Sequence, residues 1–114
     1  MSEIKKYAKD HFSERMSVLR CLTVPEWGNG KVYYKQSMNF RDQGAVLRLH
    51  ADNKPADAVI MTLILKSLDK DGKKLFSKSE MTEISLSYSP EVVSRIVTEM
   101  SDDEPVTVED AAKN

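Results

Sequence analysis

The stretch "PADAVIMTLILKSL" (Pro55 to Leu68) predicts a buried helix. A proline suits the first turn of a helix, because the N–H that it lacks would have no partner there. The apolar side chains that follow occupy most of the helical circumference, so the helix must be surrounded by protein. We therefore expect the centre of the core to be built from Val59, Ile60, Met61, Leu63, Ile64, Leu65 and Leu68.

The twelve residues that follow, "DKDGKKLFSKSE" (Asp69 to Glu80), contain the residue types of a calcium-binding EF-hand loop. Such a loop needs oxygen ligands at positions 1, 3 and 5, glycine at position 6 and glutamate at position 12. Counted from Asp69, the fifth residue is Lys73. Counted so that the glycine is sixth, the twelfth residue is Lys78. A lysine replaces a carboxylate in both registers, so we do not predict calcium binding.

The same twelve residues fit a connection between two helices. The acids and glycine of residues 69–72 make a turn in which Gly72 adopts a left-handed conformation. Ser77 and Glu80 have the spacing of a capping box, which begins the next helix. We therefore assign structural roles to Gly72, Leu75, Phe76, Ser77 and Glu80. The side chains of Leu75 and Phe76 are expected to be pinned into the core.

Two alternating runs upstream of the core helix predict a β-hairpin over about residues 17–38. They are "SVLRCLTV" (Ser17 to Val24) and "KVYYKQSM" (Lys31 to Met38), and "PEWGNG" joins them. Asn29 and Gly30 supply the positive φ angles that a hairpin turn prefers. A lone hairpin is marginal in water, so its apolar face must be covered. That face carries Val18, Leu22 and Val24 on one strand and Val32, Tyr34 and Met38 on the other.

Two further helices are expected on either side of the core helix. Asn39 can cap a helix from about Phe40 to His50, although Gly44 weakens it. Ser89 and Pro90 begin a last helix, whose apolar stripe is Val92, Val93, Ile96, Val97 and Met100. The predicted fold class is α+β and mainly helical, with an N-terminal two-stranded hairpin packed on a small bundle of about four helices over residues 40–101.

The two ends of the chain differ from this body. Residues 102–114, "DDEPVTVEDAAKN", contain five acids and one lysine, and we expect a mobile acidic tail after a single globular domain over residues 1–101. The first sixteen residues, "MSEIKKYAKDHFSERM", allow two interpretations. They pack as an amphipathic helix through Ile4, Tyr7, Ala8 and Phe12, or they mediate contacts in an oligomer.

Composition excludes several classes of protein. With 114 residues, 40% apolar, 31% charged and a net charge of -1, the chain has an ordinary globular composition without the charge excess of nucleic-acid or membrane-surface binders. Its single cysteine, Cys21, cannot form an internal disulfide. The longest apolar run falls short of the ~20 residues that a membrane helix needs, and the N-terminus does not have the pattern of a secretory signal.

The sequence also carries no catalytic or metal-binding motif. Two histidines and one cysteine are too few for a dedicated zinc site. The four glycines do not form a phosphate-binding loop, and no serine stands in a nucleophile motif. We therefore predict a protein that is not an enzyme, with no catalytic residue, no metal and no cofactor.

The order of these elements resembles the tail assembly chaperones of long-tailed (siphovirus, lambda-like) bacteriophages. In those proteins a "VPEWG" hairpin leads through a basic strand into a helix that begins with a charged pair, and an acidic turn with a Leu-Phe pair follows. The resemblance covers residues 17–114, including the ending "VEDAAKN". The matching positions are Val24, Pro25, Glu26, Trp27, Gly28, Lys35, Arg41, Asp42, Asp69, Asp71, Gly72, Leu75 and Phe76.

This resemblance implies a non-enzymatic assembly factor. Such chaperones bind the tape measure protein, keep it soluble and promote polymerisation of the tail tube around it. They act as homo-oligomers in the host bacterial cytoplasm and are absent from the mature virion. Many of their genes also make a longer product by ribosomal frameshifting, which brings in the tail tube protein. Residues 112–114 are compatible with the slippery heptamer A AAA AAC.

We predict that the partner-binding residues are Trp27, Tyr33, Lys35, Met38 and Arg41. Adaptable apolar side chains of this kind shield exposed apolar stripes of a partner helix. Trp27 has two interpretations, because a tryptophan at a hairpin tip either folds back onto its own domain or contacts a partner. The alternative function is a small nucleic-acid-binding regulatory protein that uses the tyrosines and basic residues of the hairpin.

Overall fold

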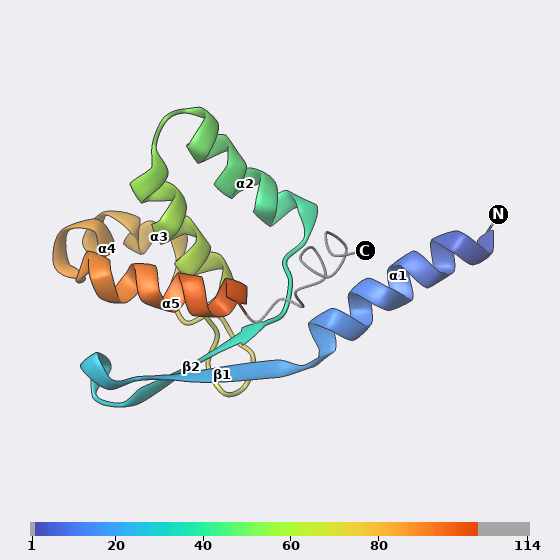
Figure 1. Cartoon of the computed structure of the whole chain (residues 1–114), viewed down its shortest axis with the longest axis horizontal. Coiled ribbons are helices and arrows are strands. Elements are labelled where there is room, and N and C mark those ends of the chain that lie inside the picture. The colour runs from blue at the N-terminus through green and yellow to red at the C-terminus, as the bar shows by residue number, and fades with distance from the viewer. Residues whose placement is uncertain (1, 103–114) are drawn as a thin grey trace, which may run out of the picture.

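The structure, a computed structural model, describes residues 2–102 and has the predicted mainly helical α+β class (Figure 1). A two-stranded hairpin follows the first helix, and four more helices follow the hairpin. The elements are α1 (Ser2–Ser17), β1 (Leu19–Val24), η1 (Pro25–Trp27), β2 (Gly30–Lys35), α2 (Phe40–Ala51), α3 (Pro55–Lys66), η2 (Lys78–Glu80), α4 (Met81–Ser87) and α5 (Pro90–Asp102). The predicted acidic tail lies outside the described residues except for Asp102, which ends α5.

The predicted centre of the core is confirmed for five of its seven residues, because Val59 and Met61 are only half-buried. The helix ends at Lys66 and not at the predicted Leu68. Helix α3 contacts α2, α4 and α5, and five of its apolar side chains are buried. The core is completed by the apolar row of α5 and by the inward face of the hairpin. Burying each such side chain stabilises the fold by about 1.5–3 kcal/mol. The cluster contains Val24, Val32, Tyr34, Ile60, Leu63, Ile64, Ile84, Val92, Val93, Ile96 and Met100.

The hairpin is shorter than predicted, and its turn differs from the prediction. The strands pair antiparallel from Leu19 opposite Lys35 to Val24 opposite Gly30. Positive φ angles occur at Gly28 and Asn29, not at Asn29 and Gly30. The reason is that η1 inserts one helical turn, and Gly28 ends it by donating its N–H to the carbonyl of Pro25. The prediction that Val18 shares the inward face is wrong, because it precedes β1 and is exposed.

The predicted boundaries of α2 and α5 are close to the observed ones. The N–H of Asp42 donates to Oδ1 of Asn39 over 2.8 Å, which is the expected cap of α2. Helix α2 ends at Ala51, one residue beyond the predicted end. Helix α5 begins at Pro90, as predicted.

The connection between α3 and α4 contains an element that the sequence did not predict. Leu68 and Tyr33 exchange both backbone hydrogen bonds, at 2.7 and 2.9 Å, so residue 68 pairs with β2 as an isolated bridge. The Asp69 carboxylate accepts the N–H groups of Asp71 and Lys73, and Gly72 has the expected left-handed φ of 81°. This network fastens the turn to the hairpin.

The end of the same connection agrees with its prediction in part. The capping box is present, and the N–H of Ser77 donates to the Glu80 carboxylate over 2.7 Å. Phe76 is half-buried and packs against the core. The prediction that Leu75 is pinned into the core is wrong, because 41% of it is exposed. The backbone of Leu75 is held, because its N–H donates to the carbonyl of Ser67 over 3.1 Å, but its side chain stays at the surface.

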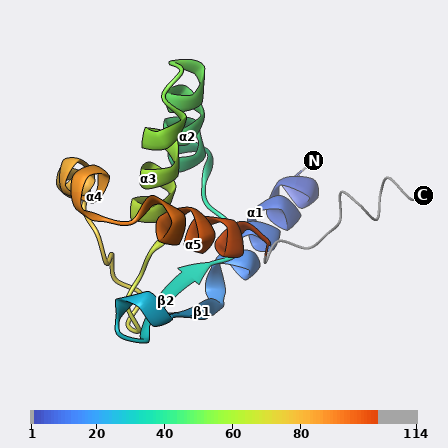
Figure 2. The same ribbon diagram turned by 60° about the vertical axis from the view of Figure 1, so that its left-hand side comes forward.

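Helix α1 extends away from the body that the other elements form (Figures 1 and 2). Its apolar side chains Ile4 and Tyr7 are exposed, so they do not pack against the rest of the chain. The division into one domain over residues 1–101 and a tail stays a prediction. No helix within residues 2–102 is both long enough and apolar enough to cross a membrane.

Candidate functional site

The hairpin tip is folded back onto the helical body. Trp27 is half-buried and meets the rings of Phe76 and Tyr88 edge to face, with centroids 6.4 and 5.6 Å apart. Phe76 and Tyr88 also contact each other, at 6.0 Å. Such pairs stabilise by about 0.5–1.5 kcal/mol beyond the burial of area. Of the two interpretations of Trp27, the structure therefore shows the one in which it packs on its own chain.

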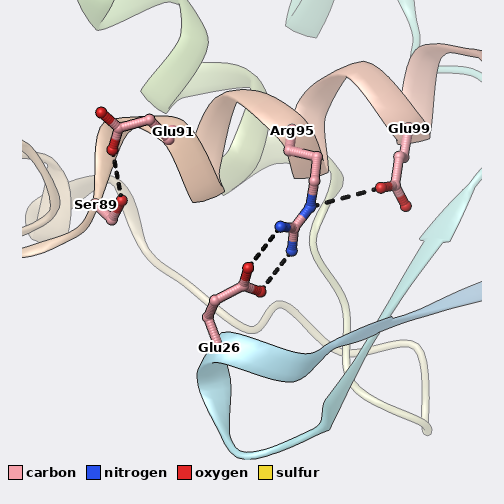
Figure 3. A network of polar contacts seen from close by, with 5 residues as sticks. All are labelled: Glu26, Ser89, Glu91, Arg95 and Glu99. Atoms are coloured by element: carbon pink, nitrogen blue, oxygen red, sulfur yellow. Dashed lines mark hydrogen bonds and ion pairs between the residues drawn. The ribbon is translucent and has the colours of Figure 1, made fainter.

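A bidentate ion pair fixes the same tip to α5 (Figure 3). Both guanidinium NH2 groups of Arg95 donate to the Glu26 carboxylate over 2.6 Å, and Nε of Arg95 lies 3.6 Å from Glu99. The hydrogen bonds from Arg95 lower the pKa of Glu26 to about 2. Because both partners are exposed, the pair orients the tip and adds little stability.

The outward face of α2 is different, because its apolar side chains are uncovered. Phe40 is 91% exposed and Leu47 is 57% exposed, although they lie on one face of the helix, two turns apart. The opposite face carries the half-buried residues Ala45, Val46 and Leu49 and packs against α3. Helix α2 thus has one apolar face that packs against α3 and a second one that residues 2–102 leave exposed.

Met38 lies at the base of this open face. With Phe12 of α1 and Phe40 of α2, it lines a hollow of about 490 Å³ where α1, the segment before α2 and α2 itself meet. A second hollow also contains Met38 and continues along α2 past Leu47 and His50. A flexible thioether in such a place can adapt to apolar partners of different shape.

The structure brings together only some of the predicted partner-binding residues. Lys35 and Met38 line a common hollow, and Arg41 is exposed in the first turn of α2. Tyr33 is half-buried in β2 and pairs through its backbone with residue 68. Trp27 lies at the tip of the hairpin and belongs to the aromatic cluster instead.

Sequence reasoning assigned no binding role to Phe40 and Leu47, and it considered Phe12 only as a contact residue of the N-terminal segment. A signal for the first two was present, because Phe40 and Leu47 stand seven residues apart and do not share a helical face with Val46 and Leu49. A helix with two apolar faces needs two covering surfaces.

The described side chains offer a surface for noncovalent binding. Within residues 2–102, no three His, Cys, Asp or Glu side chains come close enough together to hold a metal ion. The open face combines exposed apolar groups with adjacent arginines and an adaptable methionine, which is the make-up of a site for an amphipathic protein segment.

Comparison with known proteins identifies a structural relative. No protein-family model matches the chain, and no curated protein matches its sequence. Among solved structures, the chain is similar to the bacteriophage HK97 tail assembly chaperone, with a TM-score of 0.63 and 22% sequence identity. The match covers 77% of this chain and 88% of the other. The chain therefore shares the fold of a phage tail assembly chaperone, which is the fold that the sequence resemblance implied.

Proposed function

We propose that this protein is a tail assembly chaperone of a long-tailed bacteriophage, which binds the tape measure protein and promotes polymerisation of the tail tube around it. Two independent observations support the proposal. The order of sequence motifs resembles that family, and the fold matches a solved tail assembly chaperone. The observation that carries the binding role is the open apolar face of α2, with Phe40 and Leu47.

The physical basis is the covering of apolar surface. A long helical protein exposes apolar stripes until the tail tube encloses it, and such stripes associate wrongly in water. The open face of α2 and the Met38 hollow can cover one stretch of such a helix. Helix-in-groove recognition of this kind uses apolar anchors one to two turns apart, and Phe40 and Leu47 have this spacing.

Several finer proposals accompany this role. The protein associates with itself, so that several copies cover one tape measure. It acts without catalysis, in the host bacterial cytoplasm, and is left out of the mature virion. A longer frameshifted product contacts the tail tube protein. Nucleotide sequencing of the codons for residues 112–114 tests the frameshift, since it requires the heptamer A AAA AAC and an overlapping −1 reading frame.

Copurification tests the binding role. The full chain and the tape measure protein encoded in the same genome are co-expressed, and only one of them carries an affinity tag. We expect the two to copurify, and Phe40→Glu to reduce recovery at least tenfold. Leu86→Glu is the matched control, because Leu86 is a comparably exposed apolar residue on α4. Absence of the complex while both proteins are soluble would overturn the proposal.

The structure does not favour the alternative of a nucleic-acid-binding regulator. That function relies on hairpin tyrosines as stacking platforms for bases. Tyr34 is buried in the core, and Tyr33 is half-buried beside the bridge to residue 68.

A further inference from the structure

A glycine in the middle of α2 is unexplained by the fold of the chain. Gly44 stands in the interior of the helix, where glycine is less favourable than any residue except proline. Its φ angle is not positive, and a Cβ atom added to it would meet nothing within 4 Å. No turn, strained backbone or close neighbour within residues 2–102 therefore requires glycine at this position.

The position of Gly44 indicates what it is for. It lies four residues after Phe40 and three before Leu47, and this spacing places all three on the outward face of α2. Because glycine has no side chain, Gly44 leaves a depression in the helix surface between the exposed side chains of Phe40 and Leu47. A second helix can lay its backbone against that depression while its side chains pack beside Phe40 and Leu47.

Charges beside this face indicate the chemistry of the second helix. Arg41 and Arg48 are exposed and stand seven residues apart, along one flank of the row formed by Phe40, Gly44 and Leu47. Neither arginine makes an ion pair with a carboxylate of residues 2–102. Arginine pairs best with carboxylates in a bidentate arrangement, so acidic side chains two turns apart on the partner would complement them.

We infer that the outward face of α2 receives an amphipathic helix of the partner protein, whose backbone crosses at Gly44 and whose acidic flank lies along Arg41 and Arg48. The inference rests on the proposed function for the identity of the partner, the tape measure protein. Its chemistry, an apolar row edged by Asp or Glu, comes from α2 alone.

Substitutions at Gly44 test the crossing point, because they move stability and binding in opposite directions. Gly44→Ala and Gly44→Leu are expected to raise the melting temperature of the free protein, since both residues favour a helix. Binding to the tape measure protein should weaken, at least tenfold for leucine and less for alanine. Thr98→Leu is the control, because Thr98 is an exposed helical residue of α5 and lines neither of the hollows beside α2. Unchanged binding by Gly44→Leu would overturn the inference.

Designed peptides test the preference for acidic flanking residues without the natural partner. Two helical peptides carry the same leucine and alanine row, and the flanking residues are glutamates in one and lysines in the other. We expect the glutamate peptide to bind the full chain at least tenfold more tightly at low salt. The double variant Arg41→Glu, Arg48→Glu should reverse this preference. Equal binding of the two peptides to the wild-type chain would overturn the inference.

The outcomes separate the two proposals. If the tape measure protein fails to copurify while the glutamate peptide binds at Gly44, the proposed function fails and the helix site stands. If the tape measure protein copurifies equally well with Gly44→Leu, the helix site fails alone. Sedimentation of the wild-type chain and Gly44→Leu provides a further check. Loss of self-association in the variant would assign the face to a second copy of this chain and overturn the inferred partner.

Discussion

Helices α5 and α2 have similar lengths and both carry apolar residues at helical spacing, but the chain uses them differently. The row of α5 is buried against α3 and the hairpin, and Ile96 and Met100 have no exposed surface. Helix α2 contains no buried residue, and its second apolar face is open. Apolar periodicity therefore shows that a helix must be covered, but it does not show whether the cover is the chain itself or another molecule.

The charged side chains of the two helices also differ in whether they have partners within residues 2–102. On α5, Arg95 is held by Glu26 and Glu99, so the charge is used within the molecule (Figure 3). On α2, Arg41 and Arg48 have no such partner among residues 2–102. Within residues 2–102, the apolar row and the arginine of α5 are paired, whereas the outward apolar row and the two arginines of α2 are not.

The largest expected effect contrasts a core residue of α5 with an open residue of α2. Ile96→Ala should lower the free energy of unfolding by about 2–5 kcal/mol, because it leaves a cavity in the core. Leu47→Ala should change it by no more than about 0.5 kcal/mol, because that side chain is already in water. Urea unfolding of both variants measures the difference. Similar urea midpoints for the two variants would contradict the conclusion that the apolar row of α5 is buried and the outward row of α2 is exposed.

The second effect concerns the neighbours Phe76 and Leu75. Phe76→Ala should cost about 2–3 kcal/mol, because Phe76 is half-buried and contacts the rings of Trp27 and Tyr88. Leu75→Ala should cost less than about 1 kcal/mol, since its side chain is partly exposed. Thermal unfolding followed by circular dichroism compares them. A larger loss of stability for Leu75→Ala than for Phe76→Ala would show that Leu75, and not Phe76, anchors the connection between α3 and α4.

The third effect is a gain in stability on the open helix. Gly44→Ala should raise the free energy of unfolding by about 0.5–1 kcal/mol, because alanine loses less conformational entropy in a helix. Urea unfolding of the free protein measures the gain. A loss of stability would mean that the fold itself needs glycine here, and the contrast between α2 and α5 would then be weaker.

The smallest effect is the pH dependence of the ion pair on α5. The pKa of Glu26 is lowered from its ordinary value of 4.5 to about 2, chiefly because Arg95 donates hydrogen bonds to it. A carboxyl group with a lowered pKa in the folded state adds stability that is present above its unfolded pKa. That stability is lost as pH falls from 4.5 towards 2.

Comparison with Glu26→Gln isolates this contribution, because the other acidic groups are common to both proteins. The wild-type protein should melt slightly above Glu26→Gln at pH 6, and the difference should disappear near pH 2. Trp27 fluorescence is a suitable signal, since Trp27 neighbours Glu26 in the hairpin tip. A difference in melting temperature that stays constant over this range would contradict the role assigned to the pair.

Much of the fold was predictable because local signals are strong where the chain begins or ends an element. Pro55 and Pro90 start helices, Asn39 caps one, and Ser77 with Glu80 caps another. Each signal depends on backbone groups only a few residues apart, so it acts before any tertiary contact forms. The apolar residues around most of the circumference of α3 likewise identified the centre of the core from sequence alone.

Tertiary structure alone decided the site. The packing of Trp27 against Phe76 and Tyr88, and of Glu26 against Arg95, joins residues far apart in sequence. The exposure of Phe40 and Leu47 depends on which face of α2 meets α3, and two apolar faces made that choice ambiguous. The sequence by itself determines which side chains are apolar and how they are spaced along each element. Which surface covers them depends on how the helices pack, and residues 2–102 leave one apolar face of α2 exposed.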